Sequence, residues 1–177
     1  QYSLYVPHNV PTLIEKCGGK DAFEKRLNTF FDCGFYDVGN EPSFLTSCLY
    51  HWIGKPELSS QRTRSIIETY YNSSRAGLPG NDDSGAMSSW LAFHMMGFYP
   101  NAGQSYYLIT APYFKQTTLS LEKGKEFKII AKNLSDKNVF IKSATLNGKP
   151  FNQAWIEHKD IINGGELVFE MSSQPSS

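Results

Sequence analysis

Two adjacent carboxylates, Asp82 and Asp83, lie in a turn rich in Gly and Pro that runs from Gly77 to Gly85. A helix-like segment, residues 86–96, follows at once. Backbone N–H groups and the dipole at a helix N-terminus stabilise a carboxylate as its anion. This environment favours a base, a metal ligand or a hydrogen-bond acceptor over a proton-donating acid. On spacing alone, the commoner role is that one of these residues caps the helix, since Asp and Ser are preferred N-caps.

A second group of polar residues, Asn40-Glu41-Pro42-Ser43, forms a loop before another helix-like segment. Asn and Glu supply the oxygen ligands that a hard cation such as calcium prefers. The alternative is an ordinary turn that leads to Ser43 as an N-cap. Residues 81–85 lack the alternating acidic spacing and the distal Glu of an EF-hand, which excludes that motif. The chain also lacks a nucleophile elbow, a phosphate-binding loop and an HExxH pair.

The composition excludes some function classes. The 17 basic and 17 acidic residues balance, and no basic stripe occurs, so we expect no nucleic-acid partner. No apolar run approaches the ~20 residues of a membrane span. Three cysteines, Cys17, Cys33 and Cys48, show no C-x-x-C spacing, which predicts buried free thiols and not a zinc site or a disulfide framework.

Two further sequence features concern processing. The first methionine is Met87, so we expect the chain to be a processed product or a piece of a longer protein. Asn72-Ser73-Ser74 and Asn133-Leu134-Ser135 match the pattern of N-glycosylation acceptors. Such patterns arise readily by chance, and they matter only where the source glycosylates its secreted proteins.

The elements that position these residues change type along the chain. Apolar periodicity and caps predict helices first, over residues 11–18, 21–31, 43–54, 59–71 and 86–96. Alternating or clustered apolar residues then predict strands over 106–109, 117–121, 126–131, 139–146 and 167–171, with a hairpin at Asn147-Gly148. The expected fold class is therefore α+β, with a helical N-terminal half and an antiparallel β-rich C-terminal half.

Several of these motifs together resemble glycoside hydrolase family 92, the calcium-dependent, inverting exo-α-mannosidases. The resemblance rests on residues 40–42, on the block from Gly77 to Trp90 and on Gly97-Phe98-Tyr99-Pro100. Residues 143–150 and 163–165 also look like the C-terminal region of that family. The resemblance implies that residues 1–98 are the last helices of a catalytic (α/α)6 barrel. It also implies that residues 99–177 form a C-terminal β-rich subdomain.

The resemblance also implies roles for individual residues. Asp82 and Asp83 are the positions of the general base that activates water. Asn40 and Glu41 are implied as ligands or near neighbours of calcium, and Asn81 and Glu41 as contacts to the substrate. The general acid of the family is a Glu that is expected before residue 1, together with a β-sandwich, so the chain alone is predicted to be inactive.

The resemblance further implies a mannose-containing glycan as substrate and the remainder of a parent chain as partner. It places the protein in the periplasm, on the cell surface or outside the cell. Phe44-Leu45 stand where many members have two histidines, which indicates a subgroup difference, so no linkage preference is inferred. Two alternatives stay open: a non-catalytic carbohydrate-binding or scaffold module, with Trp155 as a glycan contact, and a degenerate member without activity.

Overall fold

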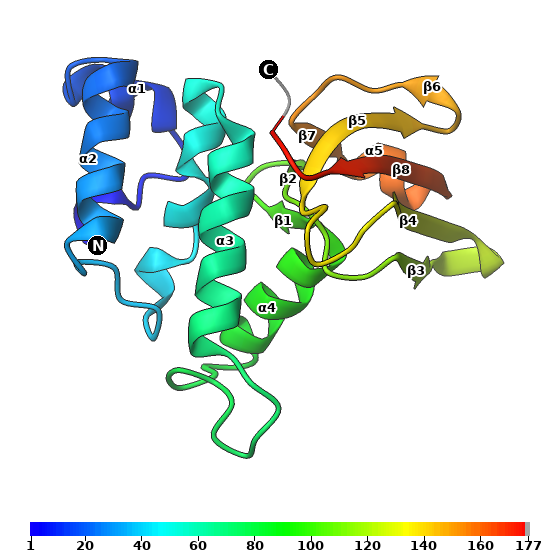
Figure 1. Ribbon diagram of the computed structural model, residues 1–177, viewed down its shortest axis with the longest axis horizontal. Coiled ribbons are helices and arrows are strands. Elements are labelled where there is room, and N and C mark those ends of the chain that lie inside the picture. Colours follow the sequence, from blue (N-terminus) through cyan, green and yellow to red (C-terminus); the bar gives the residue numbers. More distant parts are fainter. Residues whose placement is uncertain (176–177) are drawn as a thin grey trace. The chain divides into compact units, whose positions relative to one another are not determined.

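The computed structural model describes residues 1–175 and divides into two compact units, Gln1–Leu91 and Ala92–Ser177. The first unit is helical, and the second contains both sheets (Figure 1). This α+β architecture confirms the predicted fold class. Helix α4, Ala86–Met96, contains the point of division and covers the residues predicted for it. The assignment of the helical half to a barrel stays a prediction.

The N-terminal unit consists of short helices joined by loops. Asn9 caps the first α-helix by accepting a hydrogen bond from the Thr12 N–H, and Pro11 lies in the first turn, as expected. The next helix begins at Lys20, one residue before its predicted start, with Gly19 at the N-cap. The helices that precede α4 are η1 Tyr2–Leu4, α1 Val10–Lys16, α2 Lys20–Asp32, η2 Glu41–Ser43, η3 Thr46–Ile53 and α3 Pro56–Tyr70.

The segment after the Asn40 loop differs most from its prediction. It forms the 3₁₀-helices η2 and η3 in place of one α-helix capped by Ser43. Ser43 is fully buried and does not cap η3, because the N-cap residue of that helix is Leu45. The apolar residues recur every three or four positions, and over two turns that spacing suits a 3₁₀-helix as well as an α-helix.

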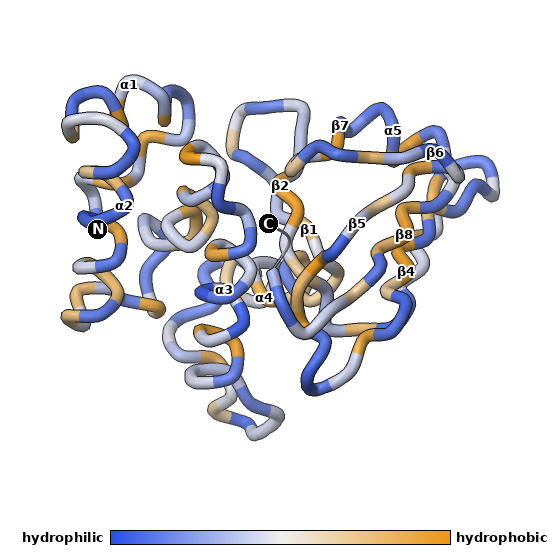
Figure 2. The backbone as a smooth tube through the Cα atoms, turned by 45° about the horizontal axis from the view of Figure 1, so that its top comes forward, coloured by the Kyte–Doolittle hydropathy of each residue, from blue (hydrophilic) through white to orange (hydrophobic). Residues whose placement is uncertain are grey.

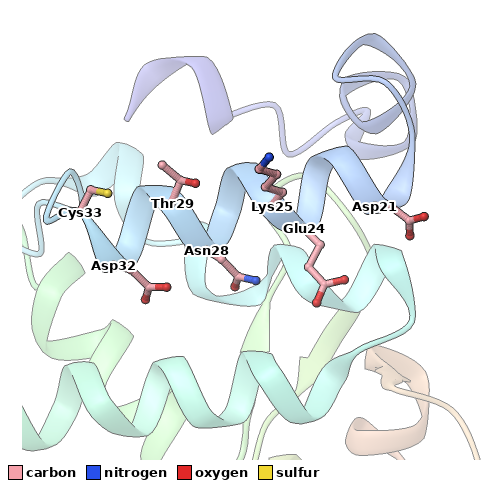
Figure 3. A pocket seen from close by; sticks show the side chains of 7 residues that line it. All are labelled: Asp21, Glu24, Lys25, Asn28, Thr29, Asp32 and Cys33. Atoms are coloured by element: carbon pink, nitrogen blue, oxygen red, sulfur yellow. The ribbon is translucent and has the colours of Figure 1, made fainter.

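Helix α2 fixes the unit through one apolar and one polar face. Phe23 and Leu27 are fully buried, while Glu24, Asn28 and Asp32 point to one side of the helix (Figure 3). These three polar groups bond respectively to Lys55 Nζ at 2.6 Å, to the Tyr50 hydroxyl at 2.8 Å and to the Arg62 guanidinium at 2.7 Å. Because the three residues are spaced four apart, they lie on one face of α2. Their bonds join α2 to Tyr50 of η3, to Lys55 just before α3 and to Arg62 of α3.

The C-terminal unit holds two sheets around one apolar core. A three-stranded sheet has the order β1-β2-β7, with β1 Phe98–Pro100, β2 Tyr106–Ile109 and β7 Trp155–Glu157. A five-stranded sheet has the order β3-β4-β8-β5-β6, with β3 Gln116–Ser120, β4 Glu126–Lys132, β5 Phe140–Leu146, β6 Lys149–Pro150 and β8 Gly165–Ser172. The short helices η4 Glu122–Gly124 and α5 His158–Ile162 connect strands.

Alternation along the strands builds this core. Phe127, Ile129 and Ala131 of β4 pack with Leu167 and Phe169 of β8, and Figure 2 shows hydrophobic stretches along both strands. Strands β4 and β8 pair in parallel, while the other strand pairs among the described residues are antiparallel. The sequence predicted an antiparallel β-rich half, so the parallel pairing of β4 with β8 was not expected.

The predicted hairpin is present in the structure, whereas only one of the three cysteines is buried as predicted. Asn147 and Gly148 take positive φ values of 50° and 76° between β5 and β6, which is the backbone that an Asn-Gly turn favours. The cysteines are free thiols, but of the three only Cys48 is buried; Cys17 is half-buried and Cys33 is exposed. Among the described residues, no helix is long and apolar enough to cross a membrane.

Candidate active site

The loops that contain the predicted site residues touch through two glycines. A Cβ atom added to Gly80 would lie 2.9 Å from both the Cα and the carbonyl oxygen of Gly39. Real Cβ contacts are essentially never that short, so only glycine lets these two backbones approach so closely. This contact brings the loop that carries Asn40 and Glu41 beside the loop that carries Asp82.

Asp82 is bound at the start of α4. Its Oδ1 accepts the Ser88 backbone N–H at 2.7 Å, and its Oδ2 accepts the Ser88 hydroxyl at 2.8 Å. Its carbonyl oxygen also accepts the Met87 N–H at 3.3 Å. The bonds to the carboxyl oxygens, from the Ser88 N–H first and then from the Ser88 hydroxyl, hold the pKa of the Asp82 carboxyl below its ordinary value. Asp82 is thus an ionised carboxylate that caps the first turn of α4.

Asp83 lies in a strained turn between this anchor and the helix. Three consecutive residues, Asp83, Ser84 and Gly85, have left-handed φ values of 41°, 60° and 86°. For a residue with a side chain, this backbone costs about 1 kcal/mol or more. The Asp83 side chain is exposed and makes no hydrogen bond or ion pair with a described residue. The turn therefore presents a carboxylate that the local structure does not use.

Glu41 has a buried carboxylate oxygen. Its Oε1 atom is shielded from solvent and has no hydrogen-bond partner among the described residues. The neighbouring Asn40 donates its Nδ2–H to Gln1 Oε1 at 3.1 Å, which leaves the Asn40 Oδ1 atom as an acceptor. A buried and unpaired carboxylate oxygen is costly, so a cation or a hydroxyl that binds here would stabilise it.

An aromatic stack connects the two loops. The buried Trp90 of α4 donates its indole N–H to the Phe44 carbonyl oxygen at 2.9 Å, directly after η2. Its ring also stacks on Tyr71, at 5.6 Å between centroids and 12° between planes. The Tyr71 hydroxyl is buried without a partner among the described residues. Burial first, and then the charge of Asp82, raise its pKa to about 12.

Sequence reasoning missed Ser88, Trp90 and Tyr71 as supports of the site. Ser88 could have been found as the third residue of α4, the usual partner of a capping side chain. The partners of Trp90 lie far away along the chain, so no local pattern predicts them. Asn81, predicted as a substrate contact, is exposed beside Asp82.

The Asn40 loop supplies only part of the donor set that a calcium ion needs. Among residues 1–175, no group of three or more His, Cys, Asp or Glu side chains is placed to hold a metal ion. Calcium takes six to eight oxygen ligands, which need not all be carboxylates. Asn40 and Glu41 therefore fit as part of such a site and cannot complete it.

An open groove of about 450 Å³ lies elsewhere in the unit, along α2 (Figure 3). Its lining residues are Asp21, Glu24, Lys25, Asn28, Thr29, Asp32 and Cys33. None of the predicted site residues is among them. Three of its polar side chains are already bonded to Tyr50, Lys55 and Arg62, so the groove is not the candidate active site.

Comparison with known proteins identifies the class. Residues 1–173 match the glycosyl hydrolase family 92 catalytic domain, so this chain belongs to glycoside hydrolase family 92. It is 32% identical to the family GH92 alpha-mannosidase BT3965 from Bacteroides thetaiotaomicron, solved in complex with mannoimidazole, with a TM-score of 0.93. It is 31% identical to the family GH92 inverting mannosidase BT2199 from the same organism, with a TM-score of 0.88.

A curated relative adds a different source. An uncharacterized secreted glycosidase from Arthroderma benhamiae is 42% identical over 177 residues, which cover 98% of this chain. The chain spans 23% of that relative, 25% of BT3965 and 27% of BT2199, while 99% and 98% of this chain align with the two solved proteins. It therefore corresponds to about a quarter of the proteins it resembles.

Proposed function

We propose that this chain provides the base side of the active site of an inverting exo-α-mannosidase that hydrolyses terminal α-mannosides of glycans. The observation that carries the proposal is the Asp82-Asp83 turn, in which one carboxylate is fully bonded and its neighbour is free of local bonds. The alpha-mannosidase and inverting-mannosidase activities named for its solved relatives support the reaction class.

Asp83 is the general base of this proposal. A base must have a lone pair within reach of the attacking water, and removing a proton requires a carboxylate that is not already occupied. The Asp82 oxygens accept two hydrogen bonds from Ser88, which lower its basicity. Asp82 is then the positioning residue that fixes the turn on α4, and Asp83 follows it in that turn with its side chain exposed.

The proton donor is proposed to lie outside this chain. Inversion uses a second carboxyl group, about 6.5–9.5 Å from the base, which protonates the leaving oxygen. Residues 1–98 are proposed as terminal helices of the catalytic barrel, and residues 99–177 as its C-terminal subdomain. The isolated chain is therefore expected to be inactive, whereas the full-length enzyme that contains it is active.

Calcium is proposed at the Asn40 loop. The Glu41 Oε1 atom and the Asn40 Oδ1 atom would be two of its oxygen ligands, and the unpaired state of Glu41 supports this. When bound, such a cation holds and polarises sugar hydroxyls. Glu41 and the exposed Asn81 are also the proposed substrate contacts. A test is calcium removal by a chelator, which should abolish mannoside hydrolysis, with Glu41→Gln needing more calcium for half-maximal activity.

The protein is proposed to act outside the cytoplasm, in the periplasm, on the cell surface or as a secreted protein. The secreted relative from Arthroderma benhamiae supports this location. A mannose-containing glycan outside the cell is the matching substrate.

The deciding experiment compares Asp83→Ala with Asp82→Asn in the full-length enzyme. Loss of a general base costs typically 10²–10⁴-fold in rate. For Asp83→Ala, we expect a kcat loss in this range and partial rescue by azide, which attacks in place of activated water and yields a β-mannosyl azide. Asp82→Asn should lower kcat without azide rescue, because Asp83 is still present. Azide rescue confined to Asp82 variants would reverse the two roles.

A non-catalytic carbohydrate-binding module is the second candidate function. Trp155 of β7 is 43% exposed, which favours this candidate because exposed aromatic rings stack on sugars. If this candidate holds, Trp155→Ala removes glycan binding while Asp83→Ala leaves it unchanged.

A further inference from the structure

Two acceptor patterns for N-linked glycans, at Asn72 and Asn133, both have an exposed asparagine and differ in the contacts that its side chain makes. We propose that Asn72 carries an N-linked glycan when the protein passes through a eukaryotic secretory pathway, and that Asn133 does not. The proposal rests on the extracellular location in the proposed function. The 42% identity to an uncharacterized secreted glycosidase from Arthroderma benhamiae supports this location.

Asn72 lies in an exposed loop directly after α3. Asn72, Ser73 and Ser74 are all exposed, and so are the two residues that follow. The Asn72 Oδ1 atom accepts the Ser74 backbone N–H at 3.0 Å, which forms an Asx turn across the acceptor pattern. The Nδ2 atom, where a glycan is attached, makes no hydrogen bond with a described residue. Attachment there breaks no contact of the fold.

The backbone of the Asn72 loop is closed by a glycine. The Asn72 N–H donates to the Gly77 carbonyl oxygen at 3.1 Å. An added Cβ on Gly77 would lie 1.9 Å from the Asn72 carbonyl oxygen. Residues 72–77 thus form a surface loop closed by a backbone hydrogen bond, and the Asn72 Nδ2 atom takes no part in closing it.

Asn133 is used by the fold at every position of its pattern. Its Nδ2 atom donates to Glu170 Oε2 of β8 at 3.1 Å, and its backbone has a left-handed φ of 62°. Leu134 packs against the hydrophobic core of the C-terminal unit. The Ser135 hydroxyl accepts the Asn138 N–H at 3.1 Å. Folding of this turn competes with glycan transfer, and a glycan would disturb the bond to Glu170.

The transfer itself is a substitution at a sugar carbon. The Asn72 amide nitrogen attacks C1 of the first sugar of a lipid-pyrophosphate-linked oligosaccharide. The C1–O bond to the pyrophosphate breaks, the C1–N bond forms, and the nitrogen loses one proton. The lipid pyrophosphate leaves, so atoms and electrons balance without an oxidant or a reductant.

The test is secretion of the full-length protein from yeast, followed by peptide mass spectrometry. Treatment with a peptide N-glycosidase in heavy-oxygen water converts each occupied Asn to a labelled Asp, which reports occupancy at both sites in one sample. We expect label at Asn72 in most copies and at Asn133 in few. Ser74→Ala, which keeps Asn72 and the backbone N–H of its turn, should remove the label from Asn72. Asn133→Gln is the matched control and should not change it.

Each outcome decides the proposal. An unlabelled Asn72 overturns it, and so does labelling of Asn133 equal to or above that of Asn72. The mannosidase activity of the same preparation is measured separately. An inactive but labelled protein contradicts the proposed function alone, whereas an active and unlabelled protein contradicts only the proposed glycan.

Discussion

The two partners in the aromatic stack, Trp90 and Tyr71, should respond in opposite ways to the loss of their polar atoms. Trp90→Phe removes the indole N–H that is bonded to the Phe44 carbonyl oxygen at 2.9 Å in a buried position. A buried acceptor left without its donor costs about 1–3 kcal/mol. The smaller ring leaves unfilled space that adds about 1 kcal/mol. We therefore expect a loss of about 2–4 kcal/mol in the free energy of unfolding.

Tyr71→Phe keeps the ring that stacks on Trp90 and removes a hydroxyl that is buried without a partner. Burying an unpaired hydroxyl costs about 1–3 kcal/mol, so its removal should be neutral or stabilising by up to about 2 kcal/mol. The two substitutions thus separate the stacking contact, which both variants retain in part, from the polar contact, which only Trp90 makes to Phe44.

The assay is guanidinium unfolding of the full-length enzyme and both variants, followed by circular dichroism, with the slope compared to confirm that only stability changed. The mannoside kcat is measured in parallel. It should fall in Trp90→Phe, because this bond ties the end of the Glu41 loop to the helix that holds Asp82. An unchanged midpoint for Trp90→Phe, or a loss above about 1.5 kcal/mol for Tyr71→Phe, would refute the reasoning.

Three further predictions concern the same site and its alternative. Ser88→Ala removes one bond to Asp82 and raises its lowered pKa. A carboxyl whose pKa is lower in the folded state stabilises the fold at pH values above its unfolded pKa. The Tm difference between Ser88→Ala and wild type should therefore be present at neutral pH and vanish as the pH falls through the folded pKa of Asp82. Gly80→Ala, whose Cβ would lie 2.9 Å from Gly39, should cost about 1–3 kcal/mol and lower kcat, measured by thermal unfolding and mannoside turnover. Trp155→Ala should leave kcat unchanged, and a loss of glycan binding in a pull-down would favour the binding-module alternative.

Local sequence patterns predicted those helices and strands that are determined by residues close together in the chain. Helix α4 covers its predicted residues because the Gly-rich turn before it and Gly97 after it, with a left-handed φ of 103°, mark its two ends. Strands β1 and β7 were missed, since three residues are too few to show alternation. The parallel pairing of β4 with β8 joins residues about forty positions apart, and no local turn pattern between the two strands predicts that they pair.

The sequence proposed candidate residues for the site, and it did not show how they are arranged relative to one another. The sequence identified Asp82 and Asp83 as a pair and left their roles open, because both are suited to a helix N-terminus. The structure separates their environments through Ser88, which bonds to both oxygens of Asp82. The contact of Gly39 with Gly80 was also beyond local reasoning, since each glycine alone reads as an ordinary turn residue.

Whether a polar atom has a nearby hydrogen-bond partner is a physical criterion for assigning roles to the residues of such a site. Asp82 has bonds for both oxygens and thereby fixes a helix, whereas Glu41 and Asp83 have an oxygen or a whole carboxylate without a local partner. Folding favours paired buried polar groups, so the unpaired Glu41 oxygen is costly; at the exposed Asp83 the cost lies in the strained backbone. Under the proposed function, the water to be activated and a cation or sugar hydroxyl would be the partners that Asp83 and Glu41 lack in the fold. The capping and catalytic interpretations of the acidic turn are therefore compatible, because the cap on Asp82 fixes the turn in which Asp83 lies.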